Sequence, residues 1–302
     1  MAEYLVTGAG GTIGGVSNSV VESLIRDGAE VRAMVHHEGE HADALRASGA
    51  QVLIGDLTDP VDVVAAMRDV KRVFFNMGVS SSYLEAATVV GAAGRANGGL
   101  ETVVNMSQMT VSQMTLTSTD QSEQHRLHWL AEQVLDWSGL PVTHVRPTVF
   151  MDNPLFTFLN AQSVRERHLL VLPFGDGRTS PIAASDVAAV VATLLRKPAD
   201  HPDHVYELTG PEVLDIGGLA SSYSRALQIP VTGVDIAYDR WLEQVLEPVG
   251  LPPHVAQHIA TMARLHRAGR YDRLTDTVQR VTGRPALTFE KYVAANPQKF
   301  VG

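Results

Sequence analysis

Short apolar runs alternate with longer segments of helical periodicity through the first half of the chain. Residues 3–7 form a β-rich run that is followed by Gly8, and residues 12–26 carry apolar side chains at helical spacing until Gly28 stops them. The same alternation predicts further strands at residues 30–35, 51–54, 72–76, 101–105 and 142–146. It predicts helices near residues 41–47, at 82–97 and at 122–137, and one more that begins at residue 59. Because strands separated by helices pair in parallel through right-handed crossovers, the pattern predicts an α/β fold with a doubly wound parallel sheet.

The regular alternation of strands and helices ends at Pro147. Shorter strands are predicted near residues 169–172, 205–208 and 231–237, with helices near 185–195 and 216–227 and almost only helix after 238. We therefore expect a first domain at residues 1–150 and a smaller, mostly helical α/β lobe at residues 151–302. No low-complexity linker separates them, so the lobe is expected to pack on the first domain.

Composition narrows the classes of function. The chain has 302 residues, no cysteine and a formal net charge of −9, which excludes thiol chemistry and argues against direct nucleic-acid binding. No apolar run approaches 18 residues, and no basic segment precedes a long apolar one near Met1. We expect a cytoplasmic protein without a membrane partner, either a monomer or a homodimer.

A glycine-rich loop follows the first strand and opens the first helix. Glycines at positions 8, 11 and 14 allow a tight turn, close approach of the backbone to a pyrophosphate, and close packing of helix on strand. The helix N-terminus adds N–H donors and a positive dipole end. This predicts a Rossmann-type dinucleotide site, the alternative being a loop that is glycine-rich only for turning. The loop residues expected at the cofactor are Gly8, Gly11, Thr12, Ile13 and Gly14.

The residues that select NAD or NADP are expected at the end of the second strand. An acidic residue there holds the ribose hydroxyls of NAD, whereas a basic residue holds the extra phosphate of NADP. Here His36 and His37 follow the strand and Glu38 comes after them. We expect NADP(H) rather than NAD(H), unless the two histidines are only solvated loop residues. Asp56 and Leu57 follow the third strand, where contact with adenine is expected; alternatively Asp56 caps a turn.

Several segments together resemble the NmrA-like group of atypical short-chain dehydrogenases/reductases. In the first half of the chain these are the glycine loop and residues 31–36, with His36 where the family usually has Arg. They continue with Glu132 and the following residues 138–147, then residues 150–153, and finally C-terminal segments at 175–178, 185–188, 208–212 and 282–285. The resemblance covers nearly the whole chain. It implies an NAD(P)-binding fold, and its members include reductases of quinones and dyes as well as redox-sensing regulators that bind dinucleotide without turning it over.

Residues at the carboxyl ends of the later strands are expected to face the ligand crevice. Ser107 ends the fifth strand, near the place of the family's catalytic serine. The nicotinamide ribose and the substrate are expected beside Asn76, Met77 and Gly78. The wall of the nicotinamide pocket is expected from Pro147, Thr148 and Phe150, although Phe150 is equally suited to an ordinary core.

The catalytic pair of ordinary short-chain reductases is missing. They use a Tyr and a Lys four residues later, yet this chain has no Tyr from 84 to 205 and no Lys from 72 to 196. Alignment on Glu132 places Gln124 and His128 at the two positions. The standard ketone-reducing mechanism is therefore not expected. Tyr83 is a substitute acid or, more simply, a packing residue.

The resemblance gives His128 a role in place of the dyad. Quinone-oxidoreductase-like and triphenylmethane-reductase-like members look similar, with His at this place. An imidazole can hydrogen-bond the nicotinamide ribose or deliver a proton; alternatively it satisfies a backbone carbonyl beneath the cofactor. Quinones and cationic dyes suit such a site, because hydride addition gives a stabilised phenolate or a neutral product without a strong acid. We expect catalytic roles for His128 and Ser107.

The sequence therefore predicts an NAD(P)H-dependent oxidoreductase that reduces a flat aromatic or conjugated small molecule, such as a quinone, an enone or a dye. The alternatives are a non-catalytic dinucleotide sensor that acts through protein partners, and other chemistry that uses the bound cofactor. No metal site is expected. His254 and His258 lie four apart on a predicted helix, but without a third ligand in register they are interpreted as surface histidines.

Overall fold

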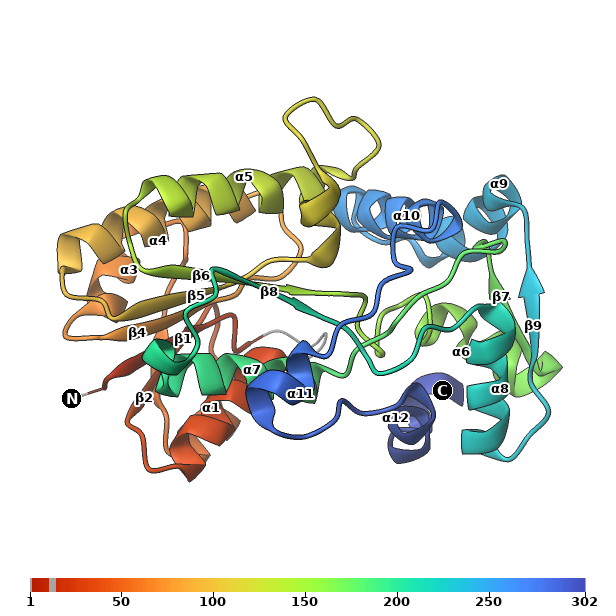
Figure 1. Cartoon of the computed structure of the whole chain (residues 1–302), viewed down its shortest axis with the longest axis horizontal. Coiled ribbons are helices and arrows are strands. Elements are labelled where there is room, and N and C mark those ends of the chain that lie inside the picture. The colour runs from red at the N-terminus through yellow and green to blue at the C-terminus, as the bar shows by residue number, and fades with distance from the viewer. Residues whose placement is uncertain (1, 11–14, 302) are drawn as a thin grey trace. The chain divides into compact units, whose positions relative to one another are not determined.

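The computed structural model describes residues 2–10 and 15–301. Its main sheet has seven strands (Figure 1). The strand order is β3-β2-β1-β4-β5-β6-β8, and every pairing from β3 to β6 is parallel. The strands are β1 (Tyr4–Thr7), β2 (Val31–Val35), β3 (Gln51–Ile54), β4 (Arg72–Phe75), β5 (Thr102–Met106), β6 (Val142–Pro147) and β8 (Val205–Leu208). The predicted fold class is confirmed, with β8 added beside β6.

Helices cover both faces of this sheet (Figure 1). One face carries α1 and α7, which also contact each other, and the opposite face carries α3, α4 and α5. Their bounds are α1 (Val16–Arg26), α2 (Glu40–Ala47), α3 (Pro60–Met67), α4 (Tyr83–Asn97), α5 (Glu123–Trp137) and α7 (Ala184–Arg196). The apolar run in β4 is completely buried at Val73, Phe74 and Phe75, as expected for a strand packed on both faces.

The chain divides into two compact units that do not follow a single boundary. The first unit comprises Met1–Val111, Arg126–Arg146 and Ala184–Tyr206, and the second comprises Ser112–His125, Pro147–Ala183 and Glu207–Gly302. Helix α7 and the start of β8 therefore belong with the large sheet, although both lie beyond residue 150. The functional roles assigned to residues 1–150 and 151–302 stay predictions.

The second unit has its own small sheet and core. Strands β7 (Leu169–Leu172) and β9 (Thr232–Asp235) pair in parallel. The helices are α6 (Phe158–Arg167), α8 (Ile216–Leu227), α9 (Tyr238–Trp241), α10 (Pro253–Arg267), α11 (Thr277–Thr282), α12 (Phe289–Ala295) and α13 (Gln298–Val301). Large buried side chains such as Phe156, Tyr223 and Trp241 fill the core. Among the helices that the structure describes in either unit, none has the length and apolarity needed to cross a membrane.

Candidate functional site

The carboxyl ends of β1 and β4 are held together at Gly8. The hydroxyl of Thr7 donates to the Asn76 carbonyl at 2.8 Å and accepts from the Asn76 backbone N–H at 2.9 Å, while the Asn76 side-chain amide donates to Ser17. A Cβ on Gly8 would lie 2.5 Å from the Asn76 carbonyl oxygen, and the φ of Gly8 is +70°. Only glycine fits this approach without strain. Gly11, Thr12, Ile13 and Gly14 lie outside the described residues, so their roles stay predictions.

A cavity of about 370 Å³ opens at the carboxyl ends of the first four strands. The predicted cofactor residues that it brings together are Gly8, His36, His37, Asp56, Leu57, Met77 and Gly78. Asn76 lies directly before Met77 and positions this edge through its contacts with Thr7. The cavity also includes Gly10 and His41, which the sequence analysis did not select. His41 stands in the first turn of α2, where its place in a helix gave no sign of a ligand role.

The side of the cavity formed after β2 and β3 is rich in imidazole. The rings of His36 and His37 lie 4.0 Å apart between centroids, and His36 Nε2 is 3.6 Å from an Asp56 carboxylate oxygen. Hydrogen bonds from the Thr58 backbone N–H and hydroxyl, with a smaller contribution from His36, lower the pKa of Asp56. Asp56 therefore organises its own turn and also faces His36, whereas its contact with adenine stays a prediction.

Glu38, the acid after β2, is already paired. Both of its carboxylate oxygens accept hydrogen bonds from Arg46 at 2.8 Å, and this pairing lowers the pKa of Glu38. Arg46 also binds Asp43 at 3.0 Å. Glu38 is thus directed toward α2 by a bidentate contact, a geometry that orients a carboxylate strongly.

Tyr83 connects α4, α5 and the end of β5 within the first unit. It is the first residue of α4 and is completely buried. Its hydroxyl donates to the Met106 carbonyl at 2.7 Å, and its ring lies 4.1 Å from the ring of His128. Burial, with a smaller effect of the Glu132 charge, raises the pKa of Tyr83. These features support the packing interpretation of Tyr83 and argue against a substitute acid.

Ser107 and His128 both lie beside Tyr83 and its contact with Met106. Ser107 follows Met106, and its backbone N–H donates to the Val145 carbonyl at 2.8 Å. Its hydroxyl is buried and has no hydrogen-bond partner among the described residues. A buried hydroxyl without a protein partner is a candidate for binding a ligand. His128 is half-buried on α5.

Glu132 lies one turn after His128 and forms a buried ion pair with Arg146 of β6. The two bonds are 2.9 Å from Arg146 Nε and 2.5 Å from the second guanidinium nitrogen, and Glu132 is 1% exposed. Such a bidentate pair fixes the position of α5 relative to β6. In the sequence Glu132 is only an alignment landmark, because its partner lies 14 residues away and the two form no local motif.

The histidines of α10 are not surface residues. In the second unit, His258 is 8% exposed and its Nδ1 lies 2.8 Å from the Ser122 hydroxyl, which also contacts His125 at 2.7 Å. Burial, with a smaller effect of His254, lowers the pKa of His258 to about 4. The surface interpretation was therefore wrong, because the helix face that the two histidines share meets the segment before α5 rather than solvent.

Gln124, the residue at the position of the family's tyrosine, takes part in the same network. Its side-chain oxygen lies 2.8 Å from His254 Nε2, and it is completely buried. An amide cannot supply the proton that a tyrosine would. The structure thus gives Gln124 a buried contact within the second unit.

The predicted nicotinamide wall also belongs to the second unit. The Thr148 backbone N–H donates to the Leu208 carbonyl at 2.9 Å, and Phe150 bridges to Ile182. Pro147 and Thr148 are buried, whereas Phe150 is half-buried and so is not a plain core residue. Their contact with nicotinamide stays a prediction.

Comparisons with known proteins extend over nearly the whole chain. Residues 3–293 match the model of the NmrA-like family. The NAD(P)H azoreductase of Xenophilus azovorans is 30% identical over 298 residues, which are 98% of each chain. The (4-alkanoyl-5-oxo-2,5-dihydrofuran-3-yl)methyl phosphate reductase of Streptomyces griseus subsp. griseus is 28% identical over 98% of each chain. In fold, the chain is similar to the NADPH-dependent quinone oxidoreductase of Escherichia coli solved with NADPH, with a TM-score of 0.82 at 22% identity over 97% of this chain and 99% of that one.

Proposed function

This chain belongs to the NmrA-like family, and we propose that it is an NAD(P)H-dependent reductase that transfers hydride to a flat conjugated acceptor, such as a quinone, an enone or a dye, without a Tyr/Lys dyad. Three of its relatives and structural neighbours carry names that fit this class. They are named for reduction of an azo compound, of a substituted dihydrofuranone phosphate and of a quinone. The specific acceptor is a matter for experiment.

The residues around the cavity fit a dinucleotide. Gly8 makes the tight turn that such a site needs after its first strand, because any side chain there would meet the Asn76 carbonyl. We assign the adenosine half to the side with His36, His37 and Asp56, and the nicotinamide ribose to the side with Met77 and Gly78. The bound nicotinamide would supply the hydride, while the chain supplies position and polarity.

NADP(H) is the proposed cofactor, in preference to NAD(H). In NAD-specific sites an acid after the second strand accepts hydrogen bonds from the ribose hydroxyls. Here the nearest such acid, Glu38, lines the cavity but is engaged by Arg46, and His36, His37 and His41 line the same cavity. Imidazoles donate hydrogen bonds to phosphate and gain charge beside it. Replacing His36 and His37 together by Ala should weaken NADPH binding about 10-fold more than NADH binding, as measured by quenching of cofactor fluorescence.

The choice of a conjugated acceptor rests on one observation: neither Gln124 nor Tyr83 supplies an acid to the substrate. Gln124 contacts His254, and the hydroxyl of Tyr83 is committed to the Met106 carbonyl with its pKa raised by burial. An acceptor that is stabilised as its own anion, or that becomes neutral on reduction, does not need a strong acid at the reacting oxygen. His128 and the buried hydroxyl of Ser107 would then hold the ribose or the acceptor in place.

The test is rapid mixing of NADPH-loaded protein with a panel of quinones, enones, azo dyes and a simple ketone. We expect loss of the reduced-nicotinamide absorbance with at least one conjugated acceptor and none with the ketone. If the protein binds NADPH tightly and no acceptor oxidises it, the reductase proposal fails and the sensor alternative replaces it.

A further inference from the structure

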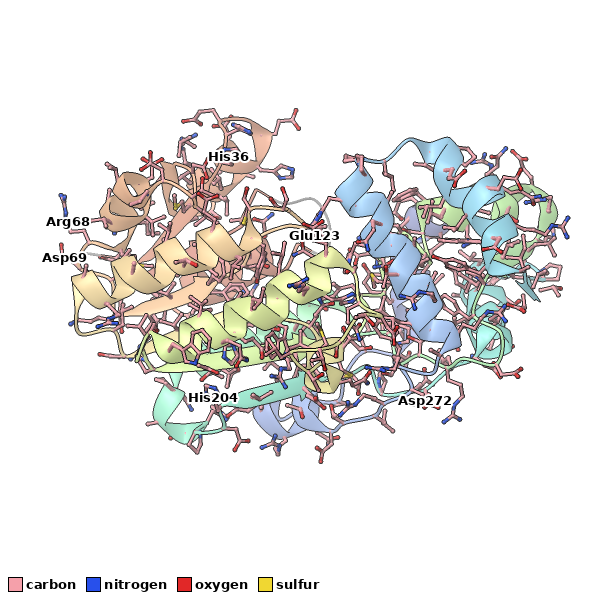
Figure 2. All side chains as sticks on the ribbon, turned by 90° about the horizontal axis from the view of Figure 1, so that it is seen from above. His36, Arg68, Asp69, Glu123, His204 and Asp272 are labelled. Atoms are coloured by element: carbon pink, nitrogen blue, oxygen red, sulfur yellow. The ribbon has the colours of Figure 1, made fainter. Side chains whose placement is uncertain are left out.

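A second cluster of polar side chains lies at the other end of the large sheet from the cofactor cavity. Asp136 is the penultimate residue of α5, His144 stands near the beginning of β6, and His204 directly precedes β8. All three belong to the first unit. Figure 2 shows His204 on the side of this unit away from His36. The cluster plays no part in the proposed reaction.

The three side chains converge on a small volume. His144 Nε2 and His204 Nε2 each lie 3.0 Å from the same oxygen, Asp136 Oδ1, and one ligand atom from each residue lies within 4.8 Å of the other two. In a tetrahedral zinc site with bonds of 2.0–2.2 Å, ligand atoms lie about 3.4 Å apart. The two distances to Asp136 Oδ1 are a few tenths of an ångström shorter than this spacing, and the two imidazole nitrogens lie within 4.8 Å of each other.

The hydrogen bond of His204 to the backbone orients its other ring nitrogen toward Asp136. Its Nδ1 is 3.0 Å from the Val142 carbonyl oxygen, which can only accept, so Nδ1 carries a proton. Nε2 is then the ring nitrogen that is available as a metal ligand, and it lies 3.0 Å from Asp136 Oδ1. A carbonyl behind Nδ1 is also the usual support of a metal-binding histidine.

His144 can offer the same kind of lone pair. It is 1% exposed, and its Nδ1 lies 2.9 Å from the side-chain nitrogen of Asn105. The Asn105 side-chain oxygen is buried and has no hydrogen-bond partner among the described residues. Rotation of this amide by half a turn lets the oxygen accept the Nδ1 proton of His144. Nε2 of His144 is then free to bind a metal, and the orphaned oxygen gains a partner.

We propose that Asp136, His144 and His204 form a binding site for a divalent transition-metal ion, with Zn²⁺ the best match to two imidazole nitrogens and one carboxylate oxygen. Water would complete the coordination, since His204 and Asp136 are 55% and 36% exposed in their side chains. The ion would join the end of α5 to β6 and β8, and so stabilise the sheet edge. The sequence showed no such site, because its residues lie 8 and 60 positions apart without a local motif.

The test is isothermal titration of the full chain, first freed of metal by a chelator, with ZnCl₂. We expect one saturable site, and a visible absorption spectrum typical of tetrahedral Co²⁺ when CoCl₂ is used instead. His204→Gln should weaken Zn²⁺ binding by about 100-fold or more, and Asp136→Asn by at least about 10-fold. His201→Gln, a histidine close in sequence but outside the cluster, is the matched control and should bind as the unaltered chain does.

Circular dichroism establishes that each variant is folded, and NADPH binding should be equal in all of them because the cluster lies outside the cofactor cavity. A rise in the Tm with added Zn²⁺, lost in His204→Gln but kept in His201→Gln, gives a second readout. The proposal is overturned if Zn²⁺ shows no saturable binding. It is also overturned if folded His204→Gln and Asp136→Asn bind Zn²⁺ as tightly as the unaltered chain.

Discussion

The ring of Tyr83 packs against the ring of His128 with centroids 4.1 Å apart and planes inclined by 51°. Because the Tyr83 hydroxyl is anchored on the Met106 carbonyl, this contact ties His128 to the end of β5, directly before Ser107. The buried pair of Glu132 and Arg146 fixes α5 one turn further along. The imidazole of His128 is thus oriented by a tyrosine whose own hydroxyl is engaged with a backbone carbonyl.

Replacement of His128 by Ala should slow hydride transfer more than it weakens cofactor binding. If the imidazole holds the acceptor or delivers a proton, loss of these interactions lowers kcat about 10²-fold. NADPH affinity should change by no more than about threefold, because the adenosine side of the cavity is untouched. Single-turnover rates and fluorescence titration measure the two effects separately. Unchanged turnover in the folded variant would remove His128 from the mechanism.

Replacement of Tyr83 by Phe should leave catalysis largely intact. The ring contact with His128 remains, and the lost hydrogen bond to the buried Met106 carbonyl lowers the free energy of unfolding by about 1–2 kcal/mol. We expect kcat within about threefold of the unaltered chain, whereas Tyr83→Ala, which also removes the ring, should lower both stability and kcat. A loss of 10²-fold or more in Tyr83→Phe, with its pH dependence altered, would show that the tyrosine is an acid after all.

Substitution of Gly8 by Ala should damage both stability and cofactor binding. The added Cβ would lie 2.5 Å from the Asn76 carbonyl oxygen at a φ of +70°, so β1 and β4 would have to separate. We expect a loss of about 1–3 kcal/mol in the free energy of unfolding, measured with urea. Gly10→Ala is the control, since its Cβ would make ordinary contacts at 3.7 Å with Val35. Equal stability of the two variants would contradict the account of this turn.

The sequence was informative where neighbours along the chain determine structure. The alternation of strands and helices in the first half of the chain follows from local patterns, and the structure confirms it. His36, His37 and Asp56 line one cavity because they follow two adjacent parallel strands. The contacts of His258 and of Glu132 could not be predicted, because their partners Ser122 and Arg146 are brought to them only by tertiary folding.

Stability should fall as the pH is lowered from about 6.5 toward 4. His258 is neutral in the folded chain, with a pKa of about 4, whereas its ordinary value is 6.5, so unfolding takes up a proton in this range. His266, with a pKa lowered to about 3 by burial, acts in the same direction. His258 alone accounts for about 3 kcal/mol across this interval. Urea unfolding at several pH values should show a smaller slope in His258→Asn, and an identical slope would contradict the assignment.

The most direct test of the central claim is transfer of deuterium from NADPH labelled at C4 of the nicotinamide to a quinone, followed by kinetics and mass spectrometry. The account predicts that labelled NADPH of one stereochemistry at C4 is oxidised more slowly than unlabelled NADPH in single turnover, with oxidation coupled to formation of the hydroquinone. For an enone acceptor, the label should appear on carbon in the product. Tight binding of NADPH with no oxidation by quinones, enones or dyes would contradict the reductase account and leave a dinucleotide-binding sensor in its place.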